Sequence, residues 1–222
     1  MSSDARFAKE EAFIRANTAI DAPPLIPEIR LHLASEVTPL WHATEATLAR
    51  SQLPPPYWAF AWPGGQALAR HLLDHPALVA GKSVLDIGAG SGLVSIAARQ
   101  AGATRVTAAE IDVFAIAAIR LNAALNKVAI EAEARDLIGG ASQWDAILVG
   151  DMCYERPLAE RLTEWLRQLA ARGATVLLGD PGRSYLPKES LREIARYTVP
   201  TSLDLEDRTS RETVIWQLFS EG

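Results

Sequence analysis

Residues 84–92 have the sequence Val84-Leu85-Asp86-Ile87-Gly88-Ala89-Gly90-Ser91-Gly92, and this stretch decides the fold. The short, mostly apolar run up to Ile87 is typical of a buried parallel strand. The glycines that follow at alternate positions let the backbone turn sharply into a helix and let a ligand approach it closely. Because ligands of open α/β sheets bind at the carboxyl ends of the strands, we expect a binding site beside this loop.

Strand-like and helix-like segments alternate on both sides of the loop. Strands are predicted over 84–87, 106–109, 130–134, 146–150 and 174–179, and helices over 65–75, 91–101, 113–126 and 157–172. This alternation predicts a parallel sheet covered by helices on both faces. A helix over 187–194 and two strands, 196–205 and 212–219, are expected to follow. The predicted fold class is therefore α/β, Rossmann-like, with a seven-stranded, mostly parallel sheet and a C-terminal antiparallel hairpin.

The chain before the loop divides at a proline cluster. Residues 2–20 have a rough apolar face that predicts an amphipathic helix, and three prolines within residues 21–27 are expected to end it. Residues 28–53 are mixed in pattern and predict an accessory layer. The connector Pro54-Pro55-Pro56 is stiff. We therefore expect an N-terminal helical extension over residues 1–53 and a ligand-binding domain over residues 54–222.

Composition limits the classes of function. The 222 residues carry a net charge of −5 and a pI of about 5.4 without a basic stripe, which disfavours DNA or RNA and favours a small-molecule or protein substrate. No uncharged apolar run is long enough to predict a membrane span. The acidic N-terminus predicts no leader, and the one cysteine, Cys153, fits a reducing compartment. We expect a cytoplasmic protein.

The spacing of the loop separates two kinds of cofactor. A nicotinamide enzyme shows G-x-G-x-x-G and places a pyrophosphate on the helix N-terminus, whereas this loop is G-x-G-x-G preceded by an acid. An acid repels a pyrophosphate but suits the amino acid end of S-adenosyl-L-methionine, which we predict as the cofactor. Asp86 is expected to orient the methionine ammonium, directly or through water. Gly88, Ala89, Gly90 and Gly92 are predicted cofactor contacts, the alternative being a tight turn without a ligand.

Two further acids follow neighbouring strands. Glu110 ends the second strand, 18 residues after Gly92, where a carboxylate accepts hydrogen bonds from both ribose hydroxyls. Asp112 is better interpreted as the N-cap of the next helix. Asp136 follows the third strand, where it either accepts from the exocyclic amine of adenine or is a solvated loop acid.

The fourth strand ends at an Asp-x-x-Tyr pair, Asp151 and Tyr154, beside the place where a methyl acceptor must sit. A lysine amine is mostly charged near neutral pH, because its ordinary pKa is about 10.4. A carboxylate attracts it, and a dry aromatic wall lowers its pKa. We predict that both residues are catalytic, the alternative for Asp151 being a helix N-cap. Asp180 after the fifth strand either shapes the acceptor pocket or belongs to a rigid Pro-Gly turn.

Several conspicuous residues have structural interpretations. Trp62 is predicted to wall the cofactor pocket, and Trp58 either does the same or packs in the core. His71 and His75 have the spacing of two metal ligands, but no third ligand is apparent, so we expect a solvated helix face and no metal site. Cys153 lacks a following histidine and is expected to be a small buried side chain.

Four segments together resemble one known family. They are residues 57–73 (YWAFAWPGGQALARHLL), 81–92 (GKSVLDIGAGSG), 150–154 (GDMCY) and 179–183 (GDPGR). Over about residues 54–219 the chain is similar to the electron transfer flavoprotein β-subunit lysine methyltransferase family, which belongs to the seven-β-strand protein lysine methyltransferases with an Asp-x-x-Tyr motif.

The resemblance implies a class I methyltransferase fold and transfer of methyl groups from S-adenosylmethionine to lysines of the flavoprotein β subunit. It also implies that Asp86, Gly88, Gly90 and Glu110 contact the cofactor. It implies that Asp151 and Tyr154 belong to the acceptor site. The alternatives are a ribosomal-protein lysine, a nicotinamide-like small-molecule amine, or a cofactor-binding module without catalysis. We expect the protein to be a monomer.

Overall fold

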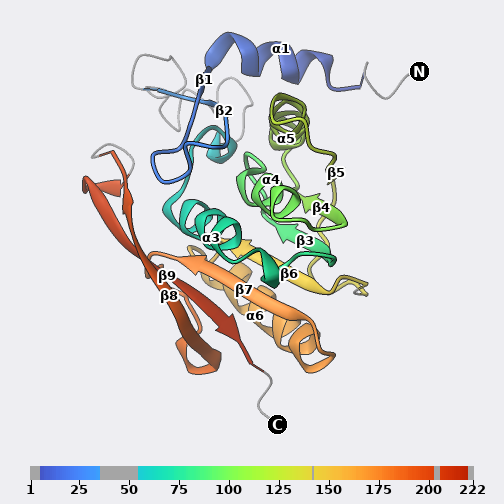
Figure 1. Cartoon of the computed structure of the whole chain (residues 1–222), viewed down its shortest axis with the longest axis vertical. Coiled ribbons are helices and arrows are strands. Elements are labelled where there is room, and N and C mark those ends of the chain that lie inside the picture. Colours follow the sequence, from blue (N-terminus) through green and yellow to red (C-terminus); the bar gives the residue numbers. More distant parts are fainter. Residues whose placement is uncertain (1–5, 36–54, 142, 203–205, 220–222) are drawn as a thin grey trace.

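A seven-stranded sheet forms the centre of the protein (Figure 1). The computed structural model describes residues 6–35, 55–141, 143–202 and 206–219. The strand order is β5-β4-β3-β6-β7-β9-β8. Strands β5 to β7 in that order pair in parallel, and β9 pairs antiparallel with both β7 and β8. The predicted mostly parallel sheet with a C-terminal hairpin at one edge is thus confirmed.

The sheet strands are β3 (Ser83–Ile87), β4 (Arg105–Ala109), β5 (Glu131–Glu133), β6 (Ala146–Gly150), β7 (Thr175–Asp180), β8 (Leu191–Pro200) and β9 (Ser210–Leu218). The helices around it are α3 (Pro63–Asp74), α4 (Leu93–Gln100), α5 (Val113–Leu125) and α6 (Arg156–Ala171). Short 3-10 turns lie at η2 (Tyr57–Ala59), η3 (Pro76–Leu78) and η4 (Lys188–Ser190). Each parallel strand follows or precedes a helix, as the alternating pattern predicted.

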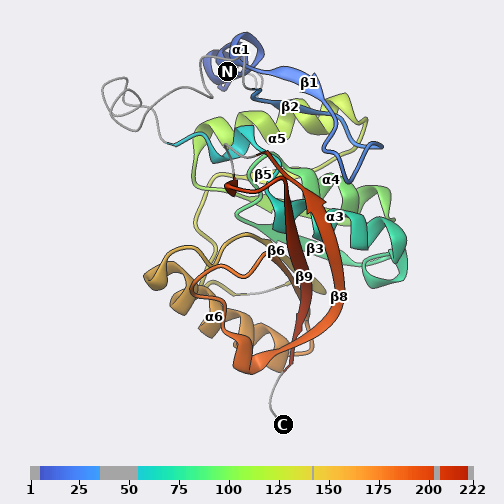
Figure 2. The same ribbon diagram turned by 90° about the vertical axis from the view of Figure 1, so that its left-hand side faces the viewer.

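Successive strand residues point to opposite faces of the sheet, and each face has its own helices. Val84 and Leu148 pack in one apolar cluster with residues of α3 and α4, and Ala108 packs on the same face against α5. Leu85 and Ile147 pack in a second cluster with α6. Figure 2 shows the β8–β9 edge toward the viewer, with α3 and α6 on opposite sides of the sheet. Both faces are therefore buried, as a parallel sheet requires.

In the described part of the N-terminal segment lie one helix and a small two-stranded sheet. Helix α1 (Ala8–Asn17) is followed by β1 (Ala19–Asp21) and β2 (Leu31–Leu33), which pair antiparallel. The prediction of a helix over residues 2–20 is wrong at its end. The side chains of Asn17 and Thr18 donate to the carbonyls of Phe13 and Ile14, and Thr18 is already extended, so the helix stops before the prolines.

Described parts of this segment share their core with the rest of the chain. Ile14 of α1 packs with Ile116 and Ile119 of α5, and Leu31 of β2 packs with Ile96 of α4. Residues 36–54 lie outside the described residues, so the predicted boundary at residue 53 and the proline connector up to residue 54 fall there. Within the described ranges, no helix is long and apolar enough to cross a membrane.

The C-terminal hairpin differs from the prediction in its first element. Instead of a helix over 187–194, η4 leads directly into β8, which starts at Leu191 and runs to Pro200. The second strand, β9, begins at Ser210 rather than at residue 212. Pairing with β9 along its whole length overrides the helical pattern of the segment, because cross-strand contacts outweigh local propensity.

Candidate active site

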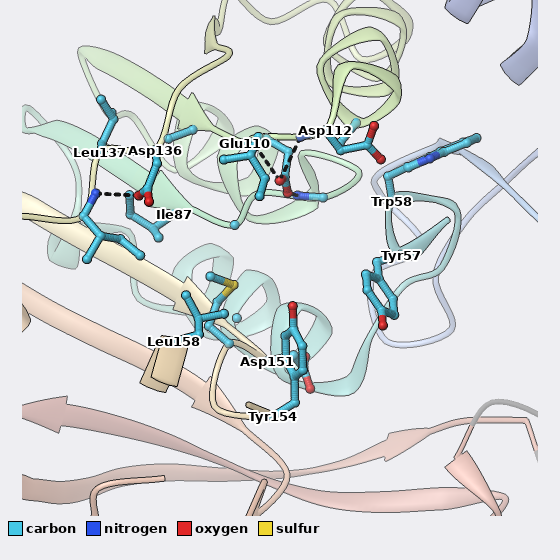
Figure 3. Close-up of a pocket in the computed structure, with 18 of the residues that line it drawn as sticks. Tyr57, Trp58, Ile87, Glu110, Asp112, Asp136, Leu137, Asp151, Tyr154 and Leu158 are labelled. Atoms are coloured by element: carbon cyan, nitrogen blue, oxygen red, sulfur yellow. Dashed lines mark hydrogen bonds between the residues drawn. The ribbon is translucent and has the colours of Figure 1, made fainter. Parts of the chain in front are cut away.

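A cavity of about 800 Å³ opens at the carboxyl ends of the parallel strands. Its walls come from the glycine loop after β3, the ends of β4 and β6, the segment after β5, and the Tyr57–Trp62 region (Figure 3). This is the position at which open α/β sheets bind their ligands. The volume is within the range of small-molecule and cofactor sites.

The glycine loop has the backbone conformation that its sequence requires. Gly88, Gly90 and Gly92 have φ angles of 64°, 51° and 81°, in the left-handed region that favours glycine. A Cβ atom on Gly88 would lie 2.1 Å from the sulfur of Met152. Gly88 and Gly90 line the cavity, whereas Gly92 is the N-cap of α4 and, like Ala89, is not part of the lining.

Asp86 lies behind this loop rather than in the cavity. Its side chain is 1% exposed, and its Oδ2 accepts a hydrogen bond from the Ser95 hydroxyl at 2.7 Å. Burial raises the pKa of the carboxyl to about 7, and the hydrogen bond from Ser95 opposes that rise. Asp86 is not among the residues that line the cavity, and its predicted role in orienting the methionine ammonium, directly or through water, stays a prediction.

Glu110 ties the loop to the end of β4. Its Oε2 accepts from the backbone N–H of Gly90 at 3.2 Å, and its Oε1 accepts from the N–H of Ile111 at 2.8 Å (Figure 3). The side chain lines the cavity, as a ribose partner must. Asp112 accepts from the N–H of Phe114 and caps α5, which confirms its predicted structural role.

Asp136 lies at the far wall of the cavity. Its Oδ1 accepts from the N–H of Ile138 at 3.0 Å, and its Oδ2 is 2.5 Å from the guanidinium of Arg161 on α6. The side chain is 41% exposed. Asp136 is therefore both a solvated loop acid and a cavity residue, and contact with adenine stays a prediction.

Asp151 lies at the opposite wall, directly after β6, with a positive φ of 57°. Its Oδ2 accepts from the N–H of Gly65 at 3.0 Å, and its Oδ1 accepts from Arg183 at 2.8 Å. It is not the N-cap of α6, which is Glu155. Burial raises the pKa of Asp151 to about 6, although Arg183 opposes that rise.

Three aromatic rings stand beside Asp151. The Tyr57 ring is 5.9 Å from Tyr154 and 6.0 Å from Trp62, measured between centroids. All three residues line the cavity, and Tyr57 and Tyr154 are 52% and 42% exposed. The indole N–H of Trp62 donates to the carbonyl of Tyr57, which fixes its orientation. This aromatic wall borders the predicted acceptor position.

The remaining candidates have structural roles. The Oδ1 atom of Asp180 accepts from the N–H groups of Gly182 and Arg183 at 2.7 Å each, so Asp180 builds a rigid turn and does not line the cavity. Cys153 is buried, and burial raises the pKa of its thiol to about 12. The predicted solvated helix face is wrong for His71, which is buried because α3 packs against the β8–β9 hairpin, and its ring contacts the hydroxyl of Tyr197; His75 is exposed. No group of metal-ligating side chains was found among the described residues.

Sequence reasoning assigned no role to Tyr57, Arg183 or Glu206. Tyr57 and Arg183 lie in segments that carry the family resemblance, so the signal for them was present. Glu206 lies in the loop before β9, and its contact with Arg183 joins positions 23 residues apart. Nothing in the pattern of that loop indicates this contact.

The same fold occurs in known methyltransferases. The family model for ribosomal protein L11 methyltransferase (PrmA) matches residues 68–177. The structure of the L11 methylase from Lactobacillus delbrueckii covers 73% of this chain and 81% of its own, with a TM-score of 0.52 and 23% identity. Magnesium protoporphyrin IX methyltransferase from Synechocystis with bound SAH covers 70% and 81%, with a TM-score of 0.53 and 17% identity. Both likenesses show the fold.

A relative that matches along most of both chains shows the family to which this chain belongs. The electron transfer flavoprotein β-subunit lysine methyltransferase of Xenopus laevis is 39% identical over 212 residues, which are 92% of this chain and 85% of the relative. The chain belongs to this family. It is an S-adenosylmethionine-dependent methyltransferase with the class I fold.

The cavity of this family member fits its cofactor. The glycine loop leaves open space for a backbone approach, because a Cβ on Gly90 would meet nothing nearer than the Cα of Trp58 at 3.9 Å. Glu110, directly after β4, contacts the loop at Gly90, and a carboxylate there suits hydroxyl and ammonium groups rather than phosphates. Trp58 is buried and its ring stacks on Phe114, which confirms a core role; it also lines the cavity, and its contact with the cofactor stays a prediction.

Proposed function

We propose that this enzyme is a protein-lysine N-methyltransferase whose substrate is the β subunit of electron transfer flavoprotein. The observation that carries the proposal is the similarity to the Xenopus laevis relative of that name along almost the whole chain. The relatives from Danio rerio and Homo sapiens, with the same name, are 39% and 37% identical over 92% and 93% of the chain.

The acceptor side of the cavity supports a lysine substrate. Tyr57, Trp62 and Tyr154 form an aromatic wall that accommodates an unbranched aliphatic chain and favours its uncharged amine. Asp151 at the base of that wall supplies a negative charge next to the aromatic faces. Positioning supplies most of the catalysis of an in-line methyl transfer, and no covalent enzyme intermediate is needed. S-adenosylmethionine supplies the activated methyl group.

We propose that Gly88, Gly90, Glu110 and Asp136 line the cofactor side, and that Trp62, predicted as a cofactor contact, stands where the cofactor side meets the aromatic wall of the acceptor side. Asp86, Ala89 and Gly92 shape the loop from behind. Asp151 and Tyr154 are the proposed catalytic residues, and both border the cavity.

The test is incubation of the purified enzyme with radiolabelled S-adenosylmethionine and purified electron transfer flavoprotein. A parallel reaction contains a cell extract from a strain that lacks the enzyme. We expect label on the β subunit, located to lysine by mass spectrometry. Label on ribosomal protein L11 or on another extract protein would support methyl transfer to protein but overturn the flavoprotein as the substrate. Label only in small molecules would indicate an amine such as nicotinamide as the acceptor.

We further propose that the enzyme acts as a cytoplasmic monomer on protein rather than nucleic acid, with residues 54–222 as its methyltransferase domain. The net charge of −5 disfavours binding to a polyanion. Light scattering on the purified protein tests the monomer, and a dimer mass would overturn it. Binding to DNA or RNA at moderate salt would contradict the protein substrate.

A further inference from the structure

Arg183, after β7, contacts two of the proposed acceptor-site residues at once. Its Nη2 and Nε lie 2.8 and 3.2 Å from Oδ1 of Asp151. The guanidinium carbon is 5.7 Å from the centre of the Trp62 ring. A guanidinium over an indole face and against a carboxylate makes two favourable contacts for one charge. Arg183 therefore links the carboxylate and the aromatic wall of the acceptor side.

The position of Arg183 is itself built by the surrounding residues. Asp180 accepts the backbone N–H of Arg183 and fixes the turn that carries it. Glu206 accepts from its Nη2 at 2.6 Å and is held in turn by Arg211 at 2.9 Å. The Arg183 and Glu206 side chains are 20% and 2% exposed. Because these groups are largely shielded from water, their ion pairs are weakly screened and geometrically specific.

Asp151 depends on this arrangement because its carboxylate is almost enclosed. The side chain is 9% exposed, and its second oxygen accepts the N–H of Gly65 in the first turn of α3. An isolated charge at such a position is costly, and a carboxyl group without a cationic partner takes up a proton instead. Among the residues that the structure describes, Arg183 is the cation in hydrogen-bond contact with Asp151.

The other titratable groups that face Asp151 do not replace this cation. Asp180 at the end of β7 is a second carboxyl, and it raises the pKa of Asp151. Cys153, two residues after Asp151, has a buried thiol that is neutral at working pH. Tyr154 is the next residue, and burial raises its pKa. Glu110 faces the site across the cavity and adds negative charge.

We propose that Arg183 is a positioning residue for methyl transfer, which holds the ionised carboxylate of Asp151 against the N-terminus of α3 and beside the Trp62 ring. The inference rests on the proposed transfer to a lysine amine. Arg183 acts through Asp151 and does not itself touch the reacting atoms. Its positive charge also offsets the negative field of Asp151, so an amine that enters the site more easily loses its proton.

Removal of the guanidinium raises the pKa of the Asp151 carboxyl and also the pKa of the substrate amine. The carboxyl of Asp151 then takes up a proton at higher pH, and an amine beside a bare carboxylate keeps its proton to higher pH. We therefore expect the acid limb of the rate profile to move upward by about one pH unit in Arg183→Gln. At a pH below the limb the rate falls about tenfold, and it recovers at high pH.

The experiment uses single-turnover methyl transfer at saturating protein substrate between pH 5.5 and 9.5. Arg183→Gln is compared with Arg211→Gln, which removes the other cation bound to Glu206 without touching Asp151. Arg183→Lys keeps the charge and is expected to restore most of the profile. We expect a large limb shift in Arg183→Gln and a small one in Arg211→Gln.

A second measurement needs no substrate. The carboxyl carbon of Asp151 is titrated by NMR in protein labelled at the aspartate carboxyl groups, with Asp151→Asn for assignment. An upward movement of its pKa in Arg183→Gln relative to native and Arg211→Gln supports the proposal. An unmoved titration, or a rate lost equally at every pH, would show that Arg183 only stabilises the fold.

If Arg183→Gln does not fold, Arg183→Met, which keeps an apolar stem but removes the charge, serves for both measurements, and an unmoved pKa of Asp151 there together with an unmoved limb overturns the proposal. Failure of the native enzyme to methylate the flavoprotein at any pH counts against the proposed substrate and leaves the NMR titration as the test of Arg183.

Discussion

The carboxylate of Asp151 accepts a hydrogen bond from the backbone N–H of Gly65, at an Oδ2–N distance of 3.0 Å across 86 residues of sequence. Gly65 lies in the first turn of α3, whose N-terminal N–H groups have no partner within the helix. The negative charge at the end of β6 thus stabilises the helix end that carries Trp62. One carboxylate joins the acceptor wall to the sheet.

Replacement of Asp151 is expected to separate chemistry from cofactor binding. An amide in Asp151→Asn still accepts from Gly65 but carries no charge, so we expect turnover to fall roughly hundredfold or more through loss of positioning. Affinity for S-adenosylhomocysteine, measured by calorimetry, is expected to stay within about twofold, since the proposed cofactor contacts remain. Glu155→Gln, four residues on and without a side-chain capping bond, is the control. Loss of cofactor binding in Asp151→Asn would show that the residue lies on the cofactor side.

Glu110→Ala is expected to weaken cofactor binding. The substitution removes a charged acceptor from the cavity and also releases the N–H of Gly90. A hydrogen bond to a charged group contributes about 1.5–3 kcal/mol, so the dissociation constant of S-adenosylhomocysteine should rise tenfold or more. Glu131→Gln, on the neighbouring strand β5 and paired with Arg105, is the matched control. An unchanged dissociation constant would remove the proposed ribose role.

Asp86→Asn is expected to stabilise the protein at alkaline pH and not at acidic pH. Burial raises the folded-state pKa of Asp86 from 3.8 to about 7, so the folded protein binds this proton more tightly than the unfolded chain. Its stabilising effect is complete below the unfolded pKa and is lost as the pH rises through about 7. Asn mimics the protonated form and still accepts from Ser95.

The measurement for Asp86 is denaturant unfolding of native and Asp86→Asn protein at pH 4 and pH 8. The difference in unfolding free energy is expected to grow with pH, by at most about 4 kcal/mol. An equal difference at both pH values would contradict a buried, titrating carboxyl. Cofactor affinity of the same variant tests the predicted role of Asp86 toward the methionine ammonium.

Substitution by alanine is expected to have opposite effects on stability at the adjacent positions Gly64 and Gly65. A Cβ on Gly64 would lie 2.2 Å from the carbonyl oxygen of Gly179 and 2.5 Å from Oδ2 of Asp151. Gly64→Ala therefore pushes α3 from β7 and is expected to cost roughly 1–3 kcal/mol or more and to lower activity. A Cβ on Gly65 would meet only Val94 at 3.9 Å. Gly65→Ala is expected to be neutral or stabilising by up to about 1 kcal/mol. The measurement is the thermal unfolding temperature of both variants. Equal changes in the two would contradict the close approach of Gly64 to Gly179.

Local patterns predicted the elements that periodicity and turn residues specify. The apolar run before Gly88 and the alternation after it predicted five parallel strands, because buried strands and their helices carry distinct periods. The same reasoning failed at residues 187–194, where pairing with β9 outweighs local propensity. It also failed at the end of α1, where Thr18 caps the preceding turn instead of continuing it.

The sequence by itself determined the sheet, the glycine loop and the position of Glu110, Asp136, Asp151 and Tyr154 at the strand ends, since these depend on neighbours in the chain. Only the tertiary structure decided that Asp86 lies behind the loop and that Asp151 already has partners. Gly65 and Arg183 reach Asp151 from two other segments, and Glu206 holds Arg183 from a third. Burial and charge pairing of this kind depend on which strands and loops meet, and a one-dimensional pattern does not contain that information.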